Sequence, residues 1–562
     1  MVEALEEDPE LESLDLDNAE LDIAAVKRLA KALAKHEALT ELDLGRNVLK
    51  DKGLWPIALA LEKNSSLAVL NLRGCSLREA GIGRLADALG RNSTLRELRL
   101  GHNNRIGTAG AETLAALLEK NCLLERLDLS STCLEEPGVL RLTEALEHNS
   151  SLATLRLRDN PLGDGAASAL STAITRRGNP LKELDLCRCG LGPRGVQSLA
   201  SALTEAGCSL SALDLLGNEI ELEGIRALSD ALEKNRSLQE LELSRTGLGE
   251  EGARILSAAL VRSRGLRELR VSRNNLGDQG LIHLSNALET NRHLQVLSAR
   301  ENCITDSGVL ALSEVLKKNK ALKELELCSN SVGDAGARGL GIALISNRCL
   351  RVLNLQENTI GDIGADGIAV GIERNSFLEE LDLSQNQIGE IGAGRLLAVL
   401  LKNKKLASLD VQYNDISEEL VESISKTASS MEGRGEANEP AKKKKAAEAD
   451  EEDEEALGDI VAMARNHREE CRVAAEEVGV AASGASASGE LGGGRRSHRL
   501  RPEEQLESLG LGDRSQALEL GAERLLRLSQ GEPSEQPSSA PGSAGADAGA
   551  GVGAAALRRQ RK

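Results

Sequence analysis

The chain has 562 residues and a formal net charge of −19, yet it contains only three aromatic residues, Trp55, Phe377 and Tyr413. A core of several hundred residues normally relies on aromatic side chains, so this core must be built from thin, regular layers of aliphatic side chains. The acidic balance argues against nucleic acid as a partner. The absence of any apolar run of about 18 residues argues against membrane insertion.

The N-terminal segment and the cysteines indicate a cytoplasmic protein. The first ten residues, MVEALEEDPE, are acidic and contain no apolar signal segment. The ten cysteines are scattered along the chain without CxxC pairs. That pattern is typical of free thiols in a reducing compartment.

A leucine pattern organises most of the chain. The motif LxxLxLxx(N/C)x(L/I/V), with Ala or Thr at the N/C position in a few units, begins at Leu11 and occurs fifteen times, the last time at Leu406. Of the fourteen intervals between successive motifs, eleven are 28 residues long and three are 29. One such unit cannot bury its own apolar side, so neighbouring units must stack to create a core.

Each unit divides into a strand, a turn and a helix, as residues 350–375 illustrate. Leu353 and Leu355 alternate with outward-facing residues, which predicts a short strand. Asn358 then turns the chain, and its side-chain amide can satisfy backbone groups that the turn leaves unpaired. The Gly-Asp-x-Gly-Ala element at 361–365 starts a helix, with the Asp near its positive end. This Asn occurs in ten units and predicts a structural ladder of Asn47, Asn103, Asn160, Asn218, Asn274, Asn302, Asn330, Asn358, Asn386 and Asn414.

The sequence therefore predicts an α/β leucine-rich repeat solenoid, a horseshoe of about 15 β-α repeats with parallel strands on the concave side and helices on the convex side. Repeats of 28 and 29 residues with a full helix resemble the ribonuclease-inhibitor-like class of leucine-rich repeat. The resemblance covers about residues 11–427. That class includes ribonuclease inhibitors, Ran GTPase-activating proteins and the C-terminal regions of NOD-like receptors. No GxxxxGK[ST] motif, the phosphate loop of a NOD-like receptor, occurs in the sequence.

The sequence contains no pattern typical of an enzyme. None of the seven histidines recurs beside a nucleophile, and no zinc-ligand spacing is present. Cys187 and Cys189 lie two residues apart, but Cys189 occupies the inward Asn/Cys position while Cys187 points outward before the turn. We interpret both as structural thiols, and we expect no catalytic residue, metal or cofactor.

The concave face is the candidate binding surface. Its outward residues lie two and four positions after the first Leu of each motif, and these two columns hold 16 acids and 4 bases. Such a wall would attract a basic protein partner. Alternatively, the acids belong to this repeat class whatever the ligand, or they keep the strand face from pairing with other chains. The candidate binding residues are Glu41, Asp43, Asp128, Glu183, Asp185, Asp214, Glu240, Glu242, Glu324, Glu326, Glu380, Asp382 and Asp410, with Tyr413 as an aromatic anchor.

The C-terminal part of the chain changes in composition. We expect residues 1–427 to form the repeat domain with its terminal caps, ending in a capping helix at 417–427. Residues 428–562 are expected to be a low-complexity, mostly disordered tail, with candidate helices at 456–478 and 515–529. Lys442–Lys445 resembles a nuclear import signal and is followed by an acidic run, Glu451–Glu455.

These observations favour a non-catalytic scaffold that binds a protein on the concave face or rim. The main alternative is a Ran-type GTPase-activating protein acting on a small GTPase, because leucine-rich repeats are followed here by an acidic stretch. Arg46 and Arg105 are the loop arginines that could serve that reaction, although neither lies in a matching motif. A further alternative is a structural component of a cytoskeletal or ciliary assembly.

Overall fold

The computed structural model describes residue 5 and residues 8–432. The expected tail therefore lies almost wholly outside the described residues. The candidate helices at 456–478 and 515–529 and the lysine run Lys442–Lys445 also fall outside them.

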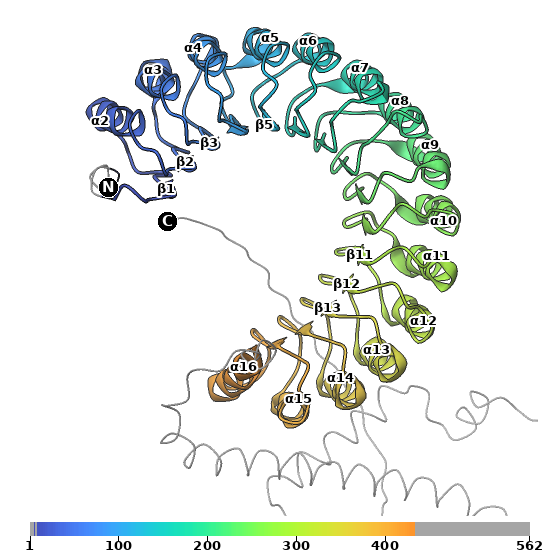
Figure 1. The fold of residues 1–562 in the computed structure, drawn as a ribbon. Coiled ribbons are helices and arrows are strands. Elements are labelled where there is room, and N and C mark those ends of the chain that lie inside the picture. The colour runs from blue at the N-terminus through green and yellow to red at the C-terminus, as the bar shows by residue number, and fades with distance from the viewer. Residues whose placement is uncertain (1–4, 6–7, 433–562) are drawn as a thin grey trace, which may run out of the picture. The chain divides into compact units, whose positions relative to one another are not determined.

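The strands form one continuous parallel sheet in which each strand pairs with the next in chain order (Figure 1). Each strand has only three residues, and the pairing joins equivalent positions, so that Leu353 lies opposite Leu381. Within the described residues the fifteen strands are β1 Ser13–Asp15, β2 Glu41–Asp43, β3 Val69–Asn71, β4 Glu97–Arg99, β5 Arg126–Asp128, β6 Thr154–Arg156, β7 Glu183–Asp185, β8 Ala212–Asp214, β9 Glu240–Glu242, β10 Glu268–Arg270, β11 Val296–Ser298, β12 Glu324–Glu326, β13 Val352–Asn354, β14 Glu380–Asp382 and β15 Ser408–Asp410.

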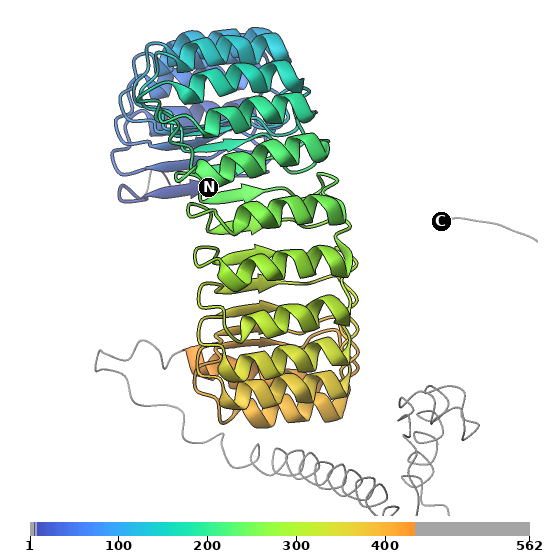
Figure 2. The ribbon, with the colours of Figure 1, turned by 90° about the vertical axis from the view of Figure 1, so that its right-hand side faces the viewer.

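A helix follows every strand, and the helices lie side by side on the outer surface (Figure 2). They are α2 Ile23–Leu33, α3 Lys50–Leu61, α4 Glu79–Leu89, α5 Gly107–Leu118, α6 Glu136–Leu146, α7 Gly163–Thr175, α8 Pro193–Leu203, α9 Glu221–Lys234, α10 Gly249–Leu260, α11 Gly277–Thr290, α12 Asp306–Leu316, α13 Asp334–Ser346, α14 Asp362–Arg374, α15 Glu390–Leu400 and α16 Glu418–Glu432. The last helix, α16, occupies the place of the expected capping helix and ends beyond residue 427. No helix among the described residues is long and apolar enough to cross a membrane.

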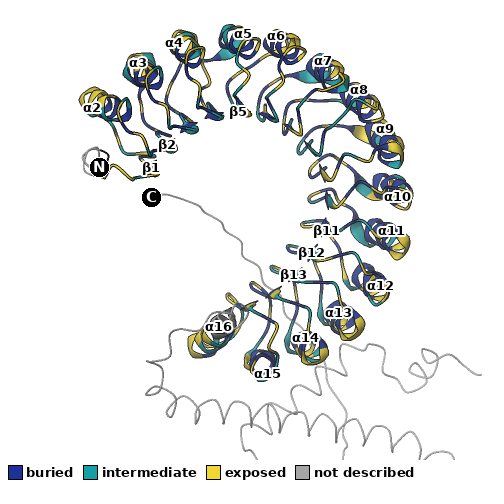
Figure 3. Ribbon diagram, viewed as in Figure 1, coloured by how far each residue is buried: buried dark blue, intermediate teal, exposed yellow. Residues whose placement is uncertain are grey.

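The core is a single aliphatic layer between the strands and the helices. Leu353 and Leu355 from the strand side and Ile368 from the helix side are fully buried, and the same positions are buried in the other repeats (Figure 3). Strands are spaced about 4.8 Å apart, whereas packed helices need about 8–10 Å, so the described repeats curve with their strands inside. The predicted leucine-rich repeat solenoid is confirmed.

In ten repeats, the Asn that follows the strand ties its repeat to the preceding one. The side-chain amide of Asn358 donates hydrogen bonds to the carbonyl oxygens of Leu327 and Leu355, each at 3.0 Å. Its side-chain oxygen accepts the backbone N–H of Val332 at 2.9 Å. One side chain thus satisfies groups from two repeats, which is why an amide recurs at this buried position.

A second row of Asn side chains, which the sequence analysis did not single out, joins the repeats at the helix end. The amide of Asn375 donates to the carbonyl oxygen of Leu344 at 2.7 Å, and its oxygen accepts the N–H of Leu378 at 2.8 Å. The repeated pattern is an Asn three residues before the first Leu. The side chains that bridge to the preceding repeat in this way are Asn64, Asn92, Asn121, Asn149, Asn235, Asn291, Asn319, Asn347, Asn375 and Asn403.

The Asp at the start of a helix also bonds to the next repeat. One carboxylate oxygen of Asp334 accepts the backbone N–H groups of Gly361 and Gly364, each at 2.8 Å. A Cβ atom at Gly364 would lie 2.7 Å from that oxygen. This Gly is therefore required by the close approach of the Asp334 carboxylate rather than by an unusual backbone conformation.

Candidate functional site

The candidate binding residues in the strands lie on the concave face and are stacked in register. The pairing places Asp185 opposite Asp214 and Asp214 opposite Glu242, and farther along it places Asp382 opposite Asp410. Neighbouring carboxylates therefore recur at the strand spacing of about 4.8 Å. Tyr413 lies after the last strand, on the loop at the edge of the face.

The acids four positions after the first Leu of each motif, at the end of the strand, have a structural role as well as a charge. The carboxylate of Asp382 accepts the backbone N–H of Ser384 at 2.9 Å, and Asp410 accepts that of Gln412 at 2.8 Å. Each bond closes the turn that ends the strand, which is a local preference of Asp and Asn side chains. The same bond is made by Asp15, Asp43, Asn71, Asp128, Asp185, Asp214, Glu242 and Asn354. Turn closure thus accounts for part of the acidity without any ligand.

In the first ten strands, arginines within the columns offset several of the acids. Arg99 lies 3.6 Å from Glu41 and 2.5 Å from Glu97, and Arg126 lies 3.3 Å from the second oxygen of Glu97. Arg270 forms an ion pair with Glu268 in the tenth strand. These paired carboxylates have less charge to offer a partner.

The middle of the face holds a pocket of about 280 Å³ between two arginines, Arg156 and Arg270. Burial, with a smaller contribution from the nearby negative charge of Asp214, raises the pKa of Asp185 to about 6. Burial is also the main cause of a raised pKa at Asp214 and at Glu242. These three carboxylates are held in positions where ionisation is unfavourable.

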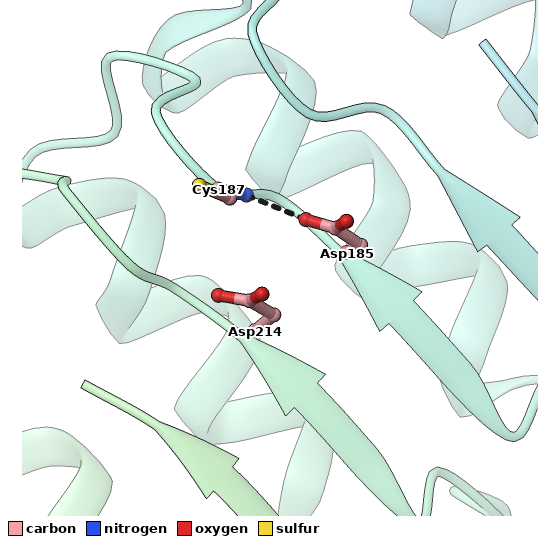
Figure 4. Close-up of side chains that lie close together, drawn as sticks. All are labelled: Asp185, Cys187 and Asp214. Atoms are coloured by element: carbon pink, nitrogen blue, oxygen red, sulfur yellow. Dashed lines mark hydrogen bonds between the residues drawn. The ribbon is translucent and has the colours of Figure 1, made fainter. Parts of the chain in front are cut away.

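Cys187 lies beside this pocket, and the structure refines its interpretation (Figure 4). It follows strand β7 as expected, but its side chain is fully buried rather than exposed. The ligand atoms of Cys187, Asp185 and Asp214 lie within 4.8 Å of one another, the single such group in the described part of the chain. Burial raises the pKa of the Cys187 thiol to about 12, and both carboxylates already accept a backbone N–H. This chemistry is typical of a protonated structural thiol.

The last strands present acids that lack a basic partner. We call Glu324, Glu326, Glu380, Asp382 and Asp410 the C-terminal acidic strip. Among the described residues, no Lys, Arg or His nitrogen lies within 4.0 Å of these carboxylates. Strands β11 to β15 contain no basic residue in either column. The pKa of Glu324 is raised by burial and by the negative charges of Glu326 and Glu268.

The rim of the face is formed by the residue just before each ladder Asn. This residue has a left-handed backbone conformation in all ten of these repeats. Tyr413 has φ 57° and is 78% exposed, so it projects at the rim and not between the strands. Arg46 has φ 56° and pairs with Asp17, with its Nε 2.9 Å from the carboxylate. Arg105 lies two repeats away from Arg46, on another loop, and makes no side-chain bond to a described residue. The two arginines therefore do not form one site.

Two family models match the chain. A TMOD/LMOD leucine-rich domain matches residues 1–126. A leucine-rich repeat model matches eight segments in the remainder, namely 148–171, 179–200, 208–229, 234–257, 263–285, 290–313, 346–369 and 374–397.

Curated relatives match over short stretches of repeats. NACHT, LRR and PYD domains-containing protein 14 of Homo sapiens is 40% identical over 92 residues, which is 16% of this chain and 8% of that protein. Tonsoku-like protein of Mus musculus is 41% identical over 98 residues, 17% of this chain and 7% of that protein. The matched stretches are thus less than a tenth of the length of these relatives.

Solved structures resemble the fold at low identity. An internalin from Listeria monocytogenes is 18% identical, with a TM-score of 0.36, and covers 66% of this chain and 87% of its own. Rad7 in its yeast complex with Elc1 is 19% identical, with a TM-score of 0.38, and covers 68% of this chain and 79% of its own. The actin-binding site 2 of leiomodin-1 is 24% identical, with a TM-score of 0.24, and covers 26% of this chain and 86% of its own.

Proposed function

The chain is a leucine-rich repeat protein of the ribonuclease-inhibitor-like type, and from this premise we propose that it is a non-catalytic scaffold whose C-terminal acidic strip binds a basic protein surface. The single observation that carries the proposal is the contrast along the concave face. In the two columns, strands β1 to β10 carry four arginines, of which Arg99, Arg126 and Arg270 pair with acids of the columns, whereas strands β11 to β15 carry no basic residue.

Because a single surface ion pair is weak, the carboxylates of the strip must contribute to binding together. One exposed ion pair contributes only about 0–1 kcal/mol, so no single carboxylate carries the affinity. Five unpaired carboxylates on one concave wall produce a summed potential that attracts a basic surface. Screening acts over about 8–10 Å at physiological salt, and binding should therefore weaken as salt rises.

The experiment removes the charge and keeps the turns. In the full chain, Glu324, Glu326 and Glu380 are changed to Gln, and Asp382 and Asp410 to Asn, because Asn keeps an oxygen to accept the turn N–H. The matched control replaces five exposed convex acids by Gln, namely Glu112, Glu119, Glu147, Glu205 and Glu223.

Proteins that co-purify with each full-length variant are then quantified by mass spectrometry. We expect the amount of co-purifying basic protein to fall at least tenfold in the strip variant and to stay unchanged in the convex control. Equal recovery by the strip variant and the wild type would refute a binding role for the strip.

The non-catalytic part of the proposal has its own test. Catalytic amounts of the full chain should leave the rate of GTP hydrolysis by Ran unchanged. An acceleration that disappears on Arg46→Ala or Arg105→Ala would establish GTPase activation instead, since such an arginine is worth about 10³–10⁵ in rate.

A second candidate is a cytoskeletal component, and it is favoured by the match of residues 1–126 to the TMOD/LMOD leucine-rich domain. Actin is the appropriate probe, because the leiomodin-1 fragment is an actin-binding site of that protein. Co-sedimentation of the full chain with actin filaments would support this candidate, and its absence with filaments and with monomeric actin would remove it.

A further inference from the structure

We propose that Lys442–Lys445 of this chain occupy its own C-terminal acidic strip and so compete with an external basic partner. The proposal rests on the proposed function in that both place a basic ligand on the same strip. It adds an intramolecular occupant for a sheet face that no described residue covers.

The first argument is reach. Helix α16 ends at Glu432 and packs against strand β15, at the end of the sheet where the strip lies. Lys442 lies ten positions after Glu432, and ten residues of extended chain span up to about 35 Å. The strip occupies strands β12 to β15, a span of about 15 Å at the strand spacing. The extended length of this segment therefore exceeds the span of the strip.

The second argument is charge complementarity. Lys442–Lys445 are four consecutive cations. Within the described residues the strip has five carboxylates and no cation within 4.0 Å. Burial and the charge of Glu326 beside it disfavour the ionised form of Glu324, and a bound cation would relieve the repulsion between the two carboxylates. The acids near the other end of the sheet are a poorer match, because Glu41 and Glu97 already pair with arginine.

The third argument is effective concentration. A short tether holds a segment at an effective concentration on the order of 1 mM. A lysine segment with an intrinsic Kd of about 0.1–1 mM, reasonable for a few exposed ion pairs, would then occupy the strip for half of the time or more. An external basic ligand would bind about two- to tenfold more weakly than to an unoccupied strip.

The test uses full-length proteins and a labelled peptide of residues 438–448, which contains the lysine run. One variant changes Lys442–Lys445 to Ala. Its matched control changes Arg558, Arg559, Arg561 and Lys562 to Ala, which removes the same number of positive charges far from α16 in the sequence. We expect the first variant to bind the peptide about two- to tenfold more tightly than the wild type and the control to bind as the wild type does. Equal affinity in all three, or an equal gain in both variants, would overturn the proposal.

Zero-length carbodiimide cross-linking of the wild type gives a second readout. The expected product joins Lys442–Lys445 to Glu380, Asp382 or Asp410 within one chain, with a yield that falls as salt rises. Cross-links to Glu451–Glu455 in place of the strip would overturn the proposal. Failure of this proposal is distinct from failure of the proposed function. The strip variant can still lose its co-purifying partners when the lysine variant binds the peptide with the affinity of the wild type.

Discussion

The Asp side chains at the strand ends each combine a turn-closing hydrogen bond with a negative charge. In Asp185 the hydrogen bond and the charge have opposite effects. The carboxylate closes the turn by accepting the N–H of Cys187 at 2.9 Å, but burial and Asp214 disfavour its charge and raise its pKa to about 6. Asn retains the acceptor oxygen and removes the charge. A substitution at this residue can therefore separate the turn from the electrostatics.

We predict that Asp185→Asn increases the free energy of unfolding at neutral pH. The folded-state pKa of Asp185 lies above its ordinary value of 3.8, so the ionised carboxylate destabilises the fold fully above about pH 6. This penalty is relieved as the pH falls from about 6 towards 4. Each pKa unit corresponds to about 1.4 kcal/mol, so the expected gain is roughly 1–3 kcal/mol at pH 7.5 and shrinks at lower pH.

Denaturant unfolding at pH 7.5, 5.5 and 4.5 measures this prediction. Asp185→Ala is the control, because it removes both the charge and the turn acceptor and should be less stable than the Asn variant at every pH. A gain in the Asn variant that is independent of pH would show that ionisation of Asp185 is not its cause.

The sequence predicted single residues well where the repeat motif contains them. The Asn that follows the strand in ten repeats belongs to the motif, and it makes the bridging bonds seen at Asn358. The helix-end Asn, such as Asn375, precedes the motif and resembles an ordinary loop residue in sequence, so its bridge to Leu344 was missed. The distribution of ion pairs was also missed, because the pairing of Arg99 with Glu41 depends on strands two repeats apart.

At the scale of elements, two neighbouring helices approach each other through glycine. Helices α13 and α14 meet at Gly341, Gly367 and Gly371, and a Cβ atom on Gly341 would collide with the carbonyl oxygen of Gly367. Backbone cannot move aside as a flexible side chain can. The spacing of these glycines is visible in the sequence, but the close approach of the two helices is not.

We predict that Gly341→Ala lowers the free energy of unfolding by about 1–3 kcal/mol, because the added methyl group overpacks this contact. Gly83→Ala in α4 is the matched control, since a Cβ atom there would have no other atom within 4 Å. That change should raise stability by about 0.5–1 kcal/mol by restricting the unfolded chain. Chemical denaturation of both variants measures the difference, and an equal effect of the two would contradict the helix contact described here.

At the scale of the molecule, the repeats depend on their last helix. Leu420 and Ile424 of α16 are buried against the final repeat, and their removal would expose apolar side chains such as Leu409. The fold class and the repeat boundaries followed from the sequence because each repeat obeys one pattern. The extent of α16 did not, because a capping helix departs from that pattern.

We predict that a chain truncated after residue 432 keeps its melting temperature within a few degrees, whereas truncation after residue 416 lowers it markedly. A solenoid is stabilised by contacts between neighbours, so an uncovered end loses a whole interface. Circular dichroism melts of the two truncated chains and the full chain give the comparison. A large loss of melting temperature in the longer truncated chain would contradict the independence of the repeats from the tail.

The most direct test of the account is carboxyl footprinting of the concave face. Full-length protein carrying Ala at Lys442–Lys445, so that its own lysines cannot cover the strip, is labelled with and without its co-purified basic partner. The account predicts that the partner protects Glu324, Glu326, Glu380, Asp382 and Asp410 while the convex acids Glu112, Glu147 and Glu205 stay equally reactive. Protection of the convex acids with an unprotected strip would contradict it.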